Sequence, residues 1–209
     1  MLDKSIPYKD IYMLLDRNAV ISAPVPPDGY SFRLYTDGDE KHWSRIETSV
    51  GEFASTRRAR AYFKREFAPY AAEMKRRCTF VCDTAGMPVG TATAWWNVVE
   101  GKRFGLVHWV SVTPCSQGLG LGKVVTQQTL QLLSLYESGN PVMLHTQTWS
   151  HIAVRMYYRL GFRMVKDVSP LCPENEFADA VSVLQKVMEP SELSPLIESA
   201  VEAKTLFTE

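Results

Sequence analysis

The chain has no excess of charge of either sign, because 23 Lys and Arg residues are balanced by 23 Asp and Glu residues. A protein that binds nucleic acid or an anionic membrane surface through its overall charge needs a basic excess. The sequence therefore predicts neither nucleic acid nor a membrane as a partner. It also has no apolar run long enough to span a bilayer, and we expect no cleaved leader at its N-terminus.

Cysteine is scarce as well. The four cysteines are Cys78, Cys82, Cys115 and Cys172, and no two pairs stand at the spacing of zinc ligands. We therefore expect no metal, reduced thiols and a cytoplasmic location. Cys115 lies near the start of a predicted helix, where a thiol can become more acidic, and we favour a structural thiol there over a reactive one.

What the chain does have is a glycine-rich turn between an apolar strand and an apolar-periodic helix. Gly118, Gly120 and Gly122 stand at alternate positions in this turn. Glycines let a backbone approach a ligand closely, and the amino end of the following helix favours an anion. The pattern predicts a site for a phosphate-bearing ligand.

Spacing excludes two common classes of phosphate loop. A P-loop needs glycine where the chain has Gln117, and Ser or Thr where it has Val124. A dinucleotide fingerprint needs a third glycine where the chain has Lys123, or Val125 if the motif starts two residues later.

The pattern that fits is Gln-x-x-Gly-x-Gly, at Gln117, Gly120 and Gly122, after the Val-x-Pro of Val112 and Pro114. It resembles motif A of the Gcn5-related N-acetyltransferases, whose loop cradles the pyrophosphate of acetyl-CoA. A glycine-rich loop alone is also compatible with a tight packing turn. A second motif is needed to decide.

The second motif runs from Ser150 to Phe162 and is similar to the family's Asn-x-x-Ala-x-x-Leu-Tyr-x-x-x-Gly-Phe. Ala153 and Tyr157 recur at helical spacing, and Gly161 is placed to end the helix in a left-handed conformation. The usual Asn is Ser150 here, which we expect to cap the helix with its side chain. The two motifs together carry the resemblance.

The resemblance implies an α/β (α+β) fold with one acetyltransferase domain, in which a mixed, mostly antiparallel sheet is flanked by helices on both faces. We expect this domain at residues 31–188, after an N-terminal extension at 1–30 and before a C-terminal helical extension at 189–209.

Several element predictions come from local pattern alone. We expect helices over 8–20, 56–77, 118–135 and 191–205, and a last strand over 178–187.

Acetyl-CoA is the cosubstrate that the resemblance implies, with no metal. The resemblance also implies that three parts of the chain contact the cofactor: the backbone of the strand before the glycine-rich turn, the turn itself, and the start of the helix after it. These residues are Val110, Ser111, Val112, Gln117, Gly118, Leu119, Gly120, Leu121, Gly122 and Lys123, together with Ser150 of the second motif.

The resemblance also implies an acid for the leaving thiolate. Tyr157 matches the position of the family's tyrosine that hydrogen-bonds the CoA sulfur, and we expect it to act as general acid. Tyr158 is the competing choice, but one helical residue turns it away by about 100°.

The general base is more open. Leu106, His108, Val110 and Val112 alternate along a predicted strand, so we expect them to share one face. His108 is the titratable residue among them. The unperturbed pKa of histidine suits a base that removes a proton from an ammonium through water. It is our candidate base, with a packing histidine as the alternative.

Two further residues are held in reserve as the base, namely Glu52 and His145. Four aromatic residues could line an acceptor pocket, and we expect at least half of them to be core: Trp43, Phe53, Trp95 and Trp96.

The function that follows is direct acetyl transfer from acetyl-CoA to a primary amine of a small molecule. A protein or peptide N-acetyltransferase is the nearest alternative, and a non-catalytic acyl-CoA-binding module is the alternative of another class. A homodimer stays open, because the sequence does not fix an oligomeric state.

Overall fold

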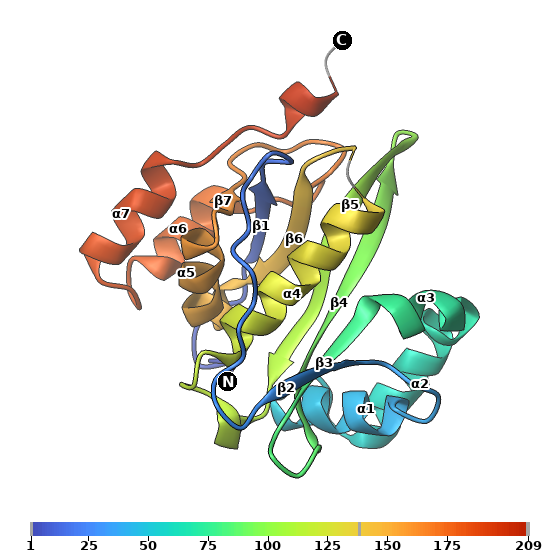
Figure 1. Ribbon diagram of the computed structural model, residues 1–209. Coiled ribbons are helices and arrows are strands. Elements are labelled where there is room, and N and C mark those ends of the chain that lie inside the picture. Colours follow the sequence, from blue (N-terminus) through green and yellow to red (C-terminus); the bar gives the residue numbers. More distant parts are fainter. Residues whose placement is uncertain (1, 138, 208–209) are drawn as a thin grey trace. The chain divides into compact units, whose positions relative to one another are not determined.

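A computed structural model describes residues 2–137 and 139–207 of the chain (Figure 1). The strands are β1 (Asp10–Leu15), β2 (Ser31–Leu34), β3 (Cys78–Cys82), β4 (Pro88–Val99), β5 (Lys102–Val112), β6 (Val142–Gln147) and β7 (Arg163–Met164). The α-helices are α1 (Glu40–Ser49), α2 (Thr56–Glu66), α3 (Ala71–Arg77), α4 (Leu121–Tyr136), α5 (His151–Arg159), α6 (Phe177–Leu184) and α7 (Pro190–Glu198). Short 3₁₀ turns are η1 (Ala68–Tyr70), η2 (Pro114–Ser116), η3 (Thr148–Ser150) and η4 (Lys204–Leu206).

The chain divides into two compact units. The first contains Ile21–Trp95 and Val107–Tyr136, and the second contains Asp3–Val20, Trp96–Leu106 and the described residues from Glu137 onward. Strands β4 and β5 each contribute residues to both units. The units are described separately below.

In the first unit, β2, β3, β4 and β5 are neighbours in that order. The pairs β2–β3 and β3–β4 are antiparallel, with Leu34 opposite Thr79 and Cys78 opposite Thr93. All five residues of β3 are buried, because alternate side chains of the strand enter two different apolar clusters. Cys78 and Cys82 are both buried in the cluster on the α1 and α2 face and pack there as small apolar residues.

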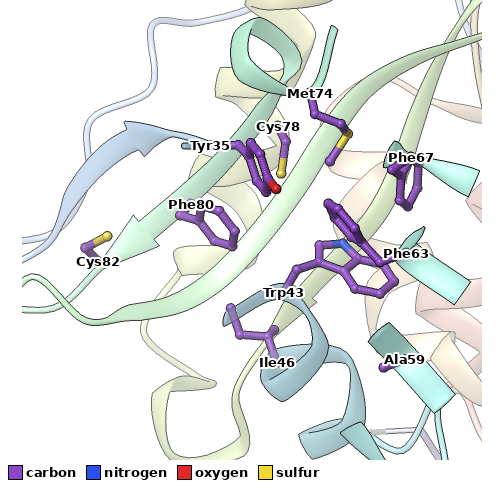
Figure 2. Close-up of a cluster of buried hydrophobic side chains, with 10 residues drawn as sticks. All are labelled: Tyr35, Trp43, Ile46, Ala59, Phe63, Phe67, Met74, Cys78, Phe80 and Cys82. Atoms are coloured by element: carbon purple, nitrogen blue, oxygen red, sulfur yellow. The ribbon is translucent and has the colours of Figure 1, made fainter. Parts of the chain in front are cut away.

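Helices cover both faces of these strands. Phe80 of β3 packs with Trp43 of α1 and Phe63 of α2 (Figure 2). Its neighbour Val81 belongs to the opposite cluster, with Leu121 and Val125 of α4. This unit therefore has the sequence's expected arrangement of a sheet between two helical layers.

In the second unit, β5, β6, β1 and β7 are neighbours in that order. The β5–β6 pair is parallel, with Leu106 opposite Met143, whereas β1 pairs antiparallel with both β6 and β7. The sheet is thus mixed and mostly antiparallel, and the predicted α/β fold class is confirmed. Among residues 2–137 and 139–207, no helix combines the length and apolarity needed to cross a membrane.

Two of the element predictions are wrong. Residues 8–20 do not form a helix but contain β1, whose side chains are buried on both faces, so that no period of two is visible. Residues 178–187 do not form a strand but overlap α6, whose buried Ala180, Val183 and Leu184 have helical spacing. The boundaries of the acetyltransferase domain stay a prediction.

Three helix predictions have the right type and the wrong bounds. The expected helix over 56–77 is interrupted by η1, which contains a proline, and the helix over 191–205 ends at Glu198. The helix after the glycine-rich turn begins at Leu121 rather than at 118, because the turn itself is left-handed at two glycines.

Candidate functional site

The glycine-rich turn has the backbone that its sequence predicts. Gly118 and Gly120 adopt φ values of +81° and +78°, where side chains with a Cβ are disfavoured. An added Cβ on either glycine would meet nothing within 4 Å, so backbone conformation rather than crowding requires glycine here. The turn is exposed, and its backbone is open to a ligand.

The turn is fixed to the end of β5 by one side chain. The Nε2 of Gln117 donates to the carbonyl of Val112 at 2.8 Å. Helix α4 then starts at Leu121, and its first backbone bond runs from the Val124 amide to the Gly120 carbonyl. The preceding amides have no intrahelical carbonyl to bind, which makes this helix start a site for an anion.

The expected cofactor-binding residues differ in whether their side chains are exposed or only their backbone is available. The side chain of Leu121 is 1% exposed and packs in the core, so only its backbone is available to a ligand. Leu119 and Lys123 are exposed, whereas Val112 and Ser111 are buried in β5. The turn and the helix start therefore offer mainly backbone groups.

Strand β5 is distorted inside this unit. Trp109 has a φ of +53°, a left-handed conformation that is strained for a bulky residue. The rings of both His108 and Trp109 lie with the aromatic residues of α1 and α2, and the His108 ring is 5.9 Å from that of Phe67. Two successive side chains thus point to one face, as at a β-bulge.

The expected shared face of β5 is therefore wrong. Val110 and Val112 pack in the α4 cluster, on the opposite face from His108. Regular alternation would have kept these three side chains together, and the left-handed Trp109 breaks it. The assignment of His108 as base stays a prediction, without the neighbours on which it was based.

A group of stacked aromatic side chains fills the α1 and α2 face. Trp43 is fully buried, and its ring lies 5.2 Å from that of Trp109 and 5.9 Å from that of Phe53. Trp95 is half-buried and lies 5.3 Å from the ring of Phe67 (Figure 2 shows Trp43 and Phe67). Trp96 belongs to the second unit, where the Arg103 guanidinium stacks 4.4 Å from its ring centroid.

The first unit also contains a carboxyl group that the sequence reasoning missed. Glu47 of α1 is fully buried, and its Oε2 accepts a hydrogen bond from the Ser111 hydroxyl at 2.8 Å. Burial raises the pKa of Glu47 well above the ordinary value, an effect that the Ser111 hydrogen bond opposes. A signal was present, because Trp43, Ile46, Glu47 and Val50 have the i, i+3, i+4, i+7 spacing of a buried helix face.

The second unit holds the tyrosine motif. Helix α5 ends as predicted: Gly161 has a φ of +100°, and the amides of Gly161 and Phe162 bind the carbonyls of Tyr158 and Tyr157. Tyr157 is 6% exposed, and its ring meets that of Phe162 edge-on at 6.0 Å. The left-handed cap is confirmed.

The expected side-chain cap at Ser150 is wrong. Ser150 precedes α5 but makes no side-chain cap hydrogen bond. It closes the 3₁₀ turn η3 and has φ and ψ of −102° and 29°, whereas a capping serine needs an extended backbone.

The two reserve bases are both exposed. Glu52 follows α1, and its amide binds the carbonyl of Glu47. His145 lies in the second unit, where its Nε2 is 2.7 Å from an oxygen of Asp10. Within the described ranges, no group of three or more His, Cys, Asp or Glu residues is arranged to hold a metal.

Comparison with known proteins adds to this geometry. The family model described as "Acetyltransferase (GNAT) family" matches residues 41–162, a segment that includes most of α1, the glycine-rich turn and the tyrosine motif. The chain belongs to this family. The resemblance drawn from the two motifs is confirmed.

A curated protein and a solved structure are also similar to this chain. A mycothiol acetyltransferase of Thermomonospora curvata is 31% identical over 158 residues, which cover 72% of this chain and 51% of the relative. A GCN5-related N-acetyltransferase of Sphaerobacter thermophilus aligns with a TM-score of 0.60 and 23% identity, over 76% of this chain and 49% of that one.

A tandem GNAT protein from the clavulanic acid biosynthesis pathway aligns with a TM-score of 0.54 and 19% identity, over 77% of this chain and 51% of that one. At these identities the two solved structures show the fold alone. The chain spans about half the length of the curated relatives it matches.

Proposed function

We propose that this GNAT chain binds acetyl-CoA and transfers its acetyl group to a primary amine of a small molecule. The observation that carries the proposal is the turn at Gly118 and Gly120, which joins an open, left-handed backbone to the start of α4. That backbone fits a pyrophosphate, because it offers amide donors without side chains in the way. Membership of the family and the mycothiol acetyltransferase relatives support a small acceptor.

Acetyl-CoA supplies the acetyl thioester in this reaction. The Gln117 side chain, tied to Val112, would hold the turn in place, and the amides at the start of α4 would bind phosphate oxygens. The β5 backbone from Val110 to Val112 would bind the pantetheine arm as an added strand. Ser150, without its expected capping bond, keeps a proposed contact with the cofactor.

Tyr157 is the proposed general acid. Its phenol would donate a proton to the sulfur as the carbon–sulfur bond breaks, which assists departure of the thiolate. The ring is fixed by burial and by its edge contact with Phe162.

The test is a thiol-release assay with acetyl-CoA and a panel of primary amines. Tyr157→Phe should lower kcat at least tenfold and leave the Kd for CoA unchanged, since the ring and its packing remain. Tyr158→Phe is the matched control: the next residue of α5 stacks its ring on Arg163, 4.6 Å away, and should keep full activity. Full activity of Tyr157→Phe would remove the acid role.

Two outcomes would change the function itself. Acetylation of peptides and of no small amine would favour a protein or peptide N-acetyltransferase. CoA binding without turnover of any amine would favour a non-catalytic acyl-CoA-binding module.

A further inference from the structure

Glu47 is a buried carboxyl group without a balancing charge. It is 0% exposed, its Oε2 accepts from Ser111, and its Oε1 has no hydrogen-bond partner among the described residues. No Lys or Arg side chain in residues 2–137 and 139–207 forms an ion pair with it. Burying such a group is costly, and an unsatisfied polar atom in a folded core calls for an explanation.

Glu47 is hydrogen-bonded to a residue of β5 that lies close to the strained Trp109. Ser111, which holds Glu47, lies two residues after the left-handed Trp109. It is also part of the strand that the proposed function assigns to the acetyl donor. The Glu47 carboxyl group is therefore bound through Oε2 to the strand on which the thioester would lie, and its Oε1 remains without a hydrogen bond.

Three half-buried rings pack around Trp43 of the same helix, and one of them, that of Tyr62, interacts electrostatically with Glu47. The rings of Phe53, Tyr62 and Trp109 lie 5.2 to 5.5 Å from one another, and each also contacts Trp43, one helical turn before Glu47. We call these three residues the aromatic wall. Aromatic faces attract organic cations, and a carboxylate beside them adds the opposite charge.

One member of the aromatic wall lies outside the helices and strands. Phe53 lies in the connection between α1 and α2, next to Gly51 with its φ of +93°. Tyr62 and Trp109 are fixed in α2 and β5. Access to Glu47 through the aromatic wall would therefore begin with displacement of the Phe53 ring.

We propose that Glu47 binds the amino group of the acceptor and takes its proton, with the aromatic wall contacting an apolar or planar group next to the nitrogen. The proposal rests on the proposed acetyl transfer and adds the class of acceptor. In place of His108, it makes Glu47 the base.

The carboxylate of Glu47 removes one proton from the ammonium, which leaves a neutral amine with a lone pair. That lone pair forms the nitrogen–carbon bond as the carbon–sulfur bond breaks, and the thiolate leaves with the bonding electrons. The nitrogen loses a second proton when the amide forms, and the thiolate gains one proton, so these two changes cancel. The proton on Glu47 returns to solvent.

Burial is the largest influence on the pKa of Glu47 and raises it. The titratable groups that interact electrostatically with Glu47 are Glu52 beyond the end of α1, Tyr62 on α2 and Cys78 on β3, and His108 of β5 lies on the same face of the sheet. Burial therefore keeps the pKa of Glu47 high, which brings a carboxyl group toward the pKa that general base catalysis favours.

The first experiment is a pH profile of kcat/KM for acetylation of 2-phenylethylamine. The parent should lose activity as the pH falls through the pKa of Glu47, and Glu47→Gln should lose at least 100-fold in kcat/KM together with this acidic limb. His108→Gln should keep the limb. Glu66→Gln, which changes an exposed carboxyl group of α2, is the matched control and should behave as the parent does.

The second experiment measures binding without turnover. In protein saturated with CoA, 2-phenylethylamine should bind at least tenfold more tightly than the uncharged 2-phenylethanol, as followed by tryptophan fluorescence. Glu47→Gln should abolish this preference, and Glu66→Gln should retain it.

The outcomes separate the two proposals. Acetylation with an unchanged acidic limb in Glu47→Gln would overturn the role of Glu47 and leave the acetyl transfer intact. CoA binding without acetylation, but with an ammonium preference that needs Glu47, would overturn the transferase and support the amine site. Loss of the limb in His108→Gln instead would return the base to His108.

Discussion

The free energy of unfolding should depend on pH in the parent and much less in Glu47→Gln. Burial raises the pKa of Glu47 in the folded protein, whereas the pKa of this group in the unfolded chain is about 4.3. Between these two values the folded state keeps a proton that the unfolded state has released. The contribution of Glu47 to stability is thus full below the unfolded pKa and is lost as the pH rises through the folded pKa.

Linkage sets the size of this effect. For every pH unit between the two pKa values, the parent loses about 1.4 kcal/mol of stability through this one group. A glutamine has the shape of the protonated acid and still accepts from Ser111, so it removes the slope and keeps the hydrogen bond. The two proteins should be similarly stable near pH 4, and Glu47→Gln should be the more stable one at pH 8.

Urea unfolding followed by tryptophan fluorescence, from pH 4 to pH 8, measures this difference directly. The difference in free energy of unfolding should grow by about 1.4 kcal/mol per pH unit and then level off above the folded pKa of Glu47. Glu66→Gln should follow the parent, since its carboxyl group is exposed. Parallel curves for the parent and Glu47→Gln would refute the reasoning, because they would mean that the pKa of Glu47 is the same in both states.

Three further substitutions test other parts of the chain. Gly120→Ala should cost about 1 kcal/mol in urea unfolding, because of its φ of +78°, and should weaken CoA binding in calorimetry. Gly161→Ala should lower Tm and cost about 2 kcal/mol, since its φ is +100° and the new Cβ would lie 3.0 Å from Leu15. Arg77→Met should cost about 2 kcal/mol in urea unfolding, because the 2% exposed guanidinium binds the Ala94 carbonyl and Glu73.

Motifs whose physics is local could be predicted from the sequence. The left-handed glycines of the turn and the cap at Gly161 follow from residue type and spacing within a few positions.

Elements whose conformation depends on distant partners could not be predicted. Strand β1 is paired on both sides, with β6 more than a hundred residues away and with β7. Its run of buried side chains has no surface period, so the local pattern cannot separate it from a helix. The capping role of Ser150 failed for a related reason, since the turn η3 before it changes the backbone at the helix start.

The strained residue of β5 and the missed carboxyl group are connected. A regular β5 would send His108 and Trp109 to opposite faces, whereas the left-handed Trp109 puts both on the face of Glu47. That conformation and the buried carboxyl group each cost stability. Two unfavourable features linked through Ser111 are best explained by a common use, because folded proteins keep such features where function requires them. The pH dependence of Glu47→Gln tests one half of this argument without any substrate, and the ammonium preference tests the other.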